Sequence, residues 1–207
     1  MKREAQIGLA CLLALLAAGG VWHGVRAGLA QALYYRAKYG AVRHDRAEVF
    51  RLCETAHRLY PHNYYFCIWT AEMAYYARPG AGPEDDRFLL SVASRWCDAG
   101  LRLNPYKSQL RMLKARLLAL SSPADGARYW ERYVDWHFWE PAHHAALAEF
   151  RAAAGDFDGA MESLKWAKGS PYYAAALRSV HDAWQRESVS GRLPPAPSRT
   201  PPTLSLP

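Results

Sequence analysis

Residues 141–171, PAHHAALAEFRAAAGDFDGAMESLKWAKGSP, decide the fold, because two helical patterns meet there at a tight break. Apolar residues recur at helical spacing on both sides of Gly155. Glycine readily adopts the left-handed conformation that ends a helix, and Asp156 can cap the helix that follows. Two small residues, Ala148 and Ala160, lie where antiparallel helices must approach closely. The stretch therefore predicts a helical hairpin.

The same pattern recurs along the chain. Alanines lie in the middle of four predicted helices, at intervals of 34, 44 and 33 residues: Ala37, Ala71, Ala115 and Ala148. The long interval contains the turn-rich segment 78–86, RPGAGPEDD, and removing an insertion of about ten residues restores the period. Asp45 with Glu48 is typical of a capping box, and Ser122 followed by proline indicates another helix start. We therefore expect about four antiparallel helix pairs.

The order of small, aromatic, glycine and proline residues in 141–171 resembles the tetratricopeptide repeat, whose unit is a helix pair of roughly 34 residues. LYPHN (59–63) and LRLNP (101–105) resemble the way such units close, although His144 stands where the family favours tryptophan. The resemblance covers residues 30–187. It implies an all-α fold, a right-handed superhelical stack of antiparallel helix pairs, in which the last predicted helix caps the open end.

The N-terminal segment is predicted to be a membrane anchor. Residues 5–25 carry no formal charge, and as a helix this run reaches about 31 Å, enough to cross a bilayer core. An uncleaved anchor is favoured because the apolar pattern continues without a loop, while a signal peptide cleaved near Gly19 is the alternative. The predicted domains are a signal anchor or transmembrane helix in 1–28, a helical-repeat domain in 29–189 and a disordered proline-rich tail in 190–207.

The charge of the chain is concentrated beside this apolar run. Residues 1–46 hold +5 of the formal net charge of +7, which suits membrane phosphates. No nucleic-acid-binding motif accompanies the charge, so nucleic acid is not an expected partner. A basic head before the apolar run is typical of an export signal, whereas Arg26, Arg36 and Lys38 after it favour the opposite orientation. We expect a single-pass protein of the bacterial inner (cytoplasmic) membrane, its N-terminal helix in lipid and its repeat domain outside the cytoplasm.

The helix predicted around residues 64–76 presents two different faces. Small residues suited to close helix packing form one face: Cys67, Thr70, Ala71 and Ala74. Larger residues point away from it, and the family resemblance implies that first helices line a concave groove for a protein or peptide partner. The predicted partner-binding groove comprises Tyr65, Ile68, Glu72, Tyr75, Tyr76, Met112 and Arg116.

The cysteines have two interpretations. Cys53 and Cys67 lie at equal distances from Tyr60, near the turn between adjacent antiparallel helices. Residues placed in this way tend to face each other, so a Cys53–Cys67 disulfide is one interpretation. The other is that these two and Cys97 are small buried residues that fill the core.

Motifs that would indicate an enzyme are missing from the sequence. The sequence contains no glycine-rich phosphate loop, no serine nucleophile elbow and no HExxH pair. His137, Glu140, His143 and His144 are the only group of metal-ligand residue types, and they lie beside Pro141 at a predicted turn, where polar residues are expected anyway. We therefore predict no enzymatic activity, no metal and no cofactor.

The function that these observations favour is that of a membrane-anchored adaptor. Such a scaffold binds a protein or peptide partner in its groove and organises an envelope complex. The alternative is an accessory subunit of a membrane enzyme in cell-surface polysaccharide or envelope assembly.

Overall fold

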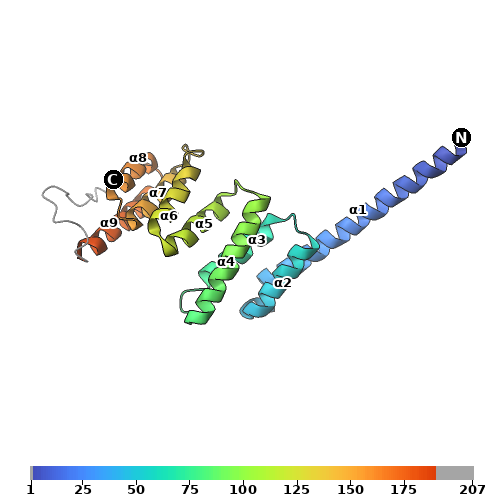
Figure 1. Cartoon of the computed structure of the whole chain (residues 1–207), viewed down its shortest axis with the longest axis horizontal. Coiled ribbons are helices and arrows are strands. Elements are labelled where there is room, and N and C mark those ends of the chain that lie inside the picture. Colours follow the sequence, from blue (N-terminus) through green and yellow to red (C-terminus); the bar gives the residue numbers. More distant parts are fainter. Residues whose placement is uncertain (1, 190–207) are drawn as a thin grey trace. The chain divides into compact units, whose positions relative to one another are not determined.

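The computed structural model describes residues 2–189, so the predicted proline-rich tail lies outside the described residues. Every regular element within 2–189 is a helix, which confirms the predicted all-α class for this range (Figure 1). The α-helices are α1 (Lys2–Tyr39), α2 (Arg46–Leu59), α3 (Tyr64–Tyr76), α4 (Pro83–Leu103), α5 (Ser108–Ser121), α6 (Pro123–Val134), α7 (Pro141–Ala153), α8 (Phe157–Ala167) and α9 (Tyr173–Val189), and a short 3₁₀ helix, η1 (Ala41–His44), follows α1.

The chain divides into two compact units, one ending at Pro105 and the other beginning at Tyr106. Unit 1 contains α1 to α4, and unit 2 contains α5 to α9. The single repeat domain over 29–189 stays a prediction.

The helix starts follow the capping residues that the sequence indicates. The side chain of Asp45 accepts a hydrogen bond from the backbone N–H of Glu48, 3.1 Å away, and Ser122 does the same for Asp125 at 3.3 Å. Asp156 caps α8 through the N–H of Gly159 at 2.9 Å. These bonds satisfy N–H groups that a helix leaves unpaired in its first turn. At the end of α7, Gly155 has φ +79°, as the hairpin between α7 and α8 requires.

The turn-rich insertion differs from its prediction. Only residues 77–82 form a loop, because Pro83 already begins α4 and the remaining residues lengthen that helix. Proline is favoured in the first turn of a helix, and the acidic residues that follow it complement the positive end of the helix dipole. An ion pair of 2.7 Å between Arg78 and Asp86 fastens the loop to α4.

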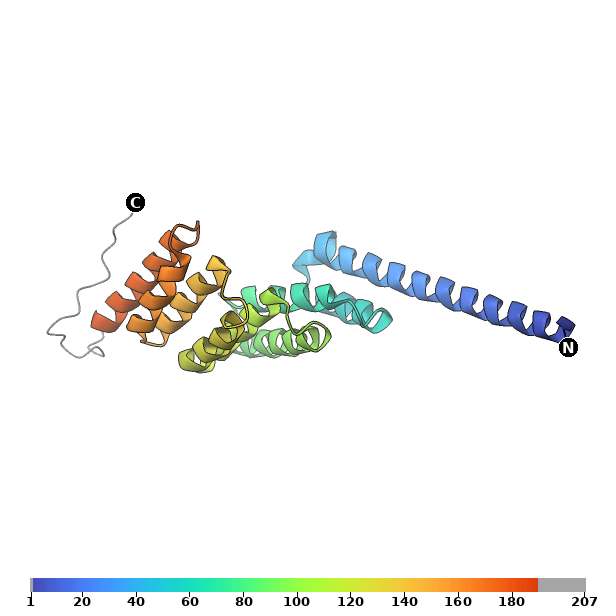
Figure 2. The ribbon, with the colours of Figure 1, turned by 90° about the horizontal axis from the view of Figure 1, so that it is seen from above.

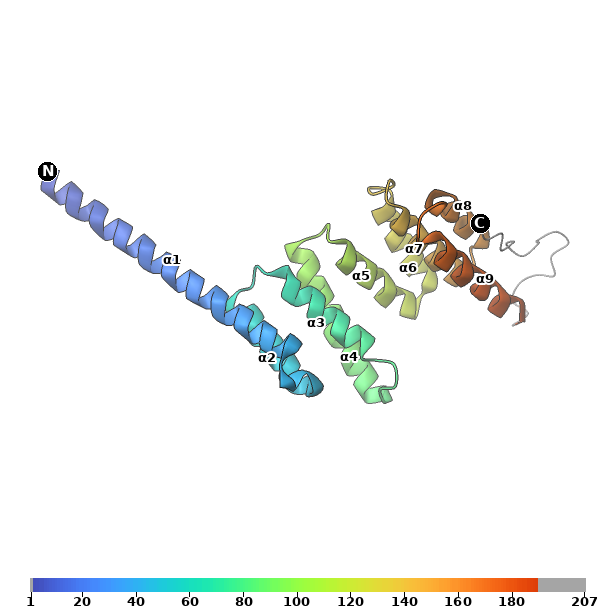
Figure 3. The ribbon, with the colours of Figure 1, turned by 180° about the vertical axis from the view of Figure 1, so that it is seen from behind.

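Unit 1 consists of two helical pairs, α1 with α2 and α3 with α4 (Figure 3). Only the C-terminal part of α1 is packed, and its N-terminal part extends past α2 (Figure 2). Ala30, Tyr34 and Ala37 of α1 are buried against α2 and against Phe66 of α3. Residues 3–25 of α1 are exposed throughout. One continuous helix therefore carries both the apolar N-terminal segment and part of the core of unit 1.

Unit 2 contains the hairpin that the sequence predicts most clearly. Ala148 and Ala160 are both fully buried in the same cluster, which lets α7 and α8 approach closely. Helix α9 covers this hairpin through Leu177 and Val180, in agreement with the predicted capping helix. Helices α5 and α6 form the other pair of the unit around the fully buried Trp130.

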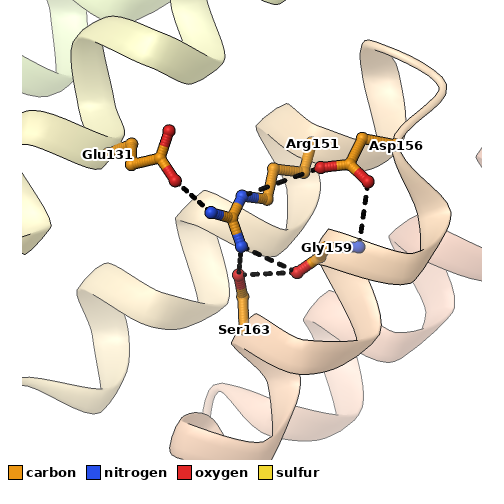
Figure 4. A network of polar contacts seen from close by, with 5 residues as sticks. All are labelled: Glu131, Arg151, Asp156, Gly159 and Ser163. Carbon is orange, nitrogen blue, oxygen red and sulfur yellow. Dashed lines mark hydrogen bonds and ion pairs between the residues drawn. The ribbon is translucent and has the colours of Figure 1, made fainter.

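A polar network around Arg151 joins three helices of unit 2 (Figure 4). Its guanidinium donates hydrogen bonds of 3.0 Å to the carbonyl oxygen of Gly159 and to Oγ of Ser163 on α8. It also forms an ion pair with Glu131 on α6, and it lies 3.9 Å from the Asp156 carboxylate. Because the side chain is only 22% exposed, the network fixes the positions of α6, α7 and α8 around one half-buried charge.

Candidate binding surfaces

The outward face of α3 holds the central residues of the predicted groove. Tyr65 and Tyr76 are 54% and 58% exposed, and Glu72 is half-buried between them. The opposite face of the helix is buried, as its small residues predict: Cys67, Thr70, Ala71 and Ala74. The structure therefore brings these three side chains together along one stripe of α3.

The other predicted groove residues lie elsewhere. Ile68 is only 5% exposed and belongs to the core, so its place in the groove is wrong. Tyr75 is half-buried, edge-on to Tyr76 at 5.3 Å and below the Arg78 guanidinium at 5.5 Å. Met112 and Arg116 lie on α5, in unit 2, where Met112 packs against Trp130 and its neighbours. Their place in the groove stays a prediction.

Helix α1 adds two tyrosines that the sequence analysis does not include. Tyr35 and Tyr39 are each more than half exposed, and their rings lie 5.8 Å apart. Their spacing of four residues, on a face away from Ala30 and Ala37, is the signal that could have revealed them. The sequence pattern of this part of α1 indicates only a continuation of the predicted anchor.

Contacts of Tyr34 place α1 beside α3. Its ring packs against Phe66 at 4.9 Å and edge-on to Trp69 at 5.7 Å. Trp69 lies on the same stripe of α3 as Tyr65 and Tyr76, so the exposed tyrosines of both helices flank this contact. We call Tyr35, Tyr39, Tyr65 and Tyr76, with Lys38 and Glu72, the tyrosine surface.

The positive charge of Lys38 lies over tyrosine rings of α1. The Lys38 Nζ lies 5.2 Å from the centroid of Tyr39 and 5.7 Å from that of Tyr34, both within cation–π range. Burial raises the pKa of Tyr34, although Lys38 opposes the shift. The surface presents four tyrosine rings with one lysine and one glutamate, which suits a partner with both apolar and polar groups.

A second aromatic surface occurs in unit 2, at the turn between α6 and α7. Trp136 and Trp139 are 78% and 64% exposed, and Phe138 between them is also exposed. His144 of α7 holds the turn in place, because its Nε2 lies 2.7 Å from the carbonyl oxygen of Phe138. The His144 ring also stacks on the exposed Trp166. We call Trp136, Phe138, Trp139 and Trp166 the tryptophan patch. Several large exposed aromatics at one place indicate an interaction site.

The histidines at this turn take part in aromatic packing. The His137 ring stacks on Tyr133 at 4.3 Å and lies 5.8 Å from the His143 ring. Nδ1 of His143 has no hydrogen-bond partner among the described residues, and burial lowers the pKa of that ring. No group of three metal-ligand side chains occurs within 2–189.

Cys53, Cys67 and Cys97 are buried, and none of them forms a disulfide in this structure. Sγ of Cys67 lies 4.0 Å from Nδ1 of His57 on α2, whereas Cys53 is buried in a cluster with Ala37, Val49 and Leu52. The two sulfurs therefore contact different neighbours, and the disulfide between them is not formed here. Burial raises the pKa of each of these two thiols to about 11. Cys97 is buried as well, as the alternative interpretation of small filling residues describes.

Comparison with known proteins gives no identity for the chain. No protein-family model matches it, and no curated protein matches it. The two aromatic surfaces and the apolar segment of α1 are therefore the observations from which a function can be inferred.

Proposed function

We propose that the protein is a single-pass membrane adaptor that binds a protein partner through its tyrosine surface. The apolar part of α1 supports the anchor, because α1 is long and apolar enough to span a membrane and this part is exposed along its whole length. The membrane is proposed to be the bacterial inner membrane, with the helical units outside the cytoplasm.

The arrangement of the helices supports a tetratricopeptide-like scaffold. Helices pair in chain order as α1 with α2, α3 with α4, α5 with α6 and α7 with α8, and α9 follows as a cap within unit 2. In a right-handed superhelical stack of such pairs the first helix of each pair lines the concave side. Helices α1 and α3, which carry the tyrosine surface, are first helices in this scheme.

The exposure of Tyr65 and Tyr76 on one stripe is the observation that carries the proposal. A tyrosine combines a large apolar ring with a polar hydroxyl and loses little side-chain entropy when it is fixed, so exposed tyrosines are effective anchors for a protein partner. The tryptophan patch supports an adaptor in particular, because a second, separate surface offers a site for a second partner. An accessory subunit of a membrane enzyme in envelope or polysaccharide assembly would use the same surfaces.

Site-specific photo-crosslinking in native membranes tests the proposal. A benzophenone amino acid replaces Tyr76, and the matched control replaces Phe88, which is 56% exposed on α4 outside the tyrosine surface. We expect one defined protein to be crosslinked from position 76 and not from position 88. Its identity distinguishes an envelope complex from a biosynthetic enzyme. Equal crosslinking from both positions, or none from position 76, would contradict the proposal.

A further inference from the structure

One end of unit 1 lies at the level where the charge-free run of α1 ends. The ring of Tyr60, in the turn between α2 and α3, packs edge-on against the ring of His23 at 5.5 Å. Next to this contact, Nη2 of Arg26 donates a hydrogen bond of 3.4 Å to the carbonyl oxygen of Arg58. His23 is within the charge-free run 5–25 and Arg26 is the first charge after it. If this run spans the bilayer, the α2–α3 turn must lie at the membrane surface.

The same end of the unit is basic. Arg58 and His62 are exposed beside the turn, and Arg102 is exposed at the end of α4. Arg102 lies near the turn, because α4 pairs with α3 across a short loop and runs back along it to the start of α3. Residues 55–66 and 99–105, which form this end, contain no Asp or Glu, and the nearest acids on these helices are Glu54 and Asp98, about one turn further back. We call Arg26, Arg58, His62 and Arg102 the basic end.

The opposite ends of the same helices carry charges of both signs, because Arg46 on α2 and Arg87 on α4 accompany acidic residues there. Helix α2 begins with Asp45 and Glu48, and α4 begins with Glu84, Asp85 and Asp86. Helix dipoles favour this polarity, because acidic residues stabilise helix starts and basic residues stabilise helix ends. As both helices end on the side of His23, their last turns place only basic residues toward the apolar segment, whereas residues of both signs lie away from it.

We propose that the basic end rests on the bilayer surface and binds anionic phospholipid headgroups. This inference rests on the proposed membrane anchoring. Aromatic side chains such as Tyr60 concentrate at the boundary between headgroups and hydrocarbon, and arginines pair well with phosphates. Each basic side chain held near an anionic membrane surface strengthens its attraction about fivefold. The contact would hold unit 1 in a fixed orientation at the membrane, instead of leaving it free to tilt on α1.

The test measures the depth of the turn in the full-length protein, reconstituted in nanodiscs of phosphatidylcholine with or without phosphatidylglycerol. A nitroxide label is attached at His62→Cys or, as the distal reference, at Ala47→Cys, which is exposed in the first turn of α2. Both carry Cys11→Ser, and the other native cysteines are buried. A water-soluble nickel chelate reports how accessible each label is to water.

We expect the label at 62 to be several-fold less accessible to nickel than the label at 47 when phosphatidylglycerol is present. Arg58→Gln with Arg102→Gln should raise the accessibility at 62, whereas Arg46→Gln with Arg87→Gln, the same charge loss at the opposite helix ends, should not. Equal accessibility at 62 and 47 overturns the proposed contact. Equal accessibility of 62 in both lipid mixtures overturns the preference for anionic headgroups. Failure of the protein to insert into nanodiscs would instead refute the anchor.

Discussion

Side chains one position apart on α3 have opposite environments. Tyr65 is half exposed, whereas Phe66 is 1% exposed and packs against Tyr34 of α1. Neighbouring residues on a helix point about 100° apart, so this change from surface to core follows from the backbone geometry.

Truncation of the surface tyrosines should therefore leave the fold intact. We expect Tyr65→Ala with Tyr76→Ala to change the melting temperature very little, because both side chains remain largely in water. Phe66→Ala should cost about 3–5 kcal/mol of unfolding free energy, since it leaves a cavity. Thermal unfolding followed by circular dichroism compares the two, and unfolding of the tyrosine variant would place these side chains in the core.

The buried thiols predict a loss of stability in alkali. The pKa of Cys53 and of Cys67 is about 11 in the folded protein, above the value of about 8.5 for an exposed thiol. Below about pH 8.5 both thiols are protonated in the folded and in the unfolded chain, so their full contribution to the unfolding free energy is present. Between the two values only the unfolded chain releases the protons, so the unfolding free energy should fall as pH rises, by about 3 kcal/mol for each thiol.

Urea unfolding at pH 8 and pH 10.5 measures this fall. A variant with Cys53→Ala and Cys67→Ala should show a smaller fall between the two pH values, although it will be less stable at both. An equal fall in the variant and the natural protein would assign the effect to other groups.

Arg151 stabilises unit 2 through a half-buried charge. Its replacement by alanine leaves Glu131 without its ion pair and Ser163 without a donor, so we expect a loss of about 2 kcal/mol. The matched control is Arg128→Ala, which removes an exposed ion pair with Asp125 and should cost less than about 1 kcal/mol. Chemical denaturation measures the unfolding free energy of both variants. Equal losses would show that the Arg151 network stabilises the fold no more than the exposed ion pair does.

At the scale of elements, the α7–α8 hairpin depends on the small residues between its helices. Ala148 has no exposed surface, so we expect Ala148→Trp to overpack the interface and cost roughly 1–3 kcal/mol. Ala153→Trp, on the exposed side of the same helix, is the control and should be nearly neutral. An unchanged melting temperature for Ala148→Trp would contradict the close approach of α7 and α8.

Helices and hairpins could be predicted from the sequence because their signals are local. The caps Asp45 and Asp156 and the spacing of small residues belong to single elements or adjacent pairs. Which residues form a surface is harder to predict from local signals, because it depends on which other helices cover each side of a helix. Ile68 and Tyr65 are both large and lie near the same face, and helical spacing alone does not tell that only Ile68 is covered. The sequence does not indicate Tyr35 and Tyr39 as surface residues, because they continue the apolar pattern of α1.

At the scale of the whole molecule, α1 combines two roles in one helix. Ala30, Tyr34 and Ala37 belong to the core of unit 1, while residues 5–25 are exposed and carry no formal charge. An apolar surface of this length is unfavourable in water and favourable in lipid. We therefore expect the protein to stay with membranes through high-salt and carbonate washes. Recovery of a soluble chain that begins near Gly20 would show instead that the segment is a cleaved signal.

Affinity purification from native membranes in mild detergent tests the central claim, partner binding through the tyrosine surface, most directly. The natural protein is compared with Tyr65→Ala/Tyr76→Ala and with Phe88→Ala/Tyr172→Ala, which removes two exposed aromatics outside that surface. We predict that the partner is lost only from the first variant, and that both variants keep the melting temperature of the natural protein. A stable Tyr65→Ala/Tyr76→Ala protein that retains the partner in full would contradict the account.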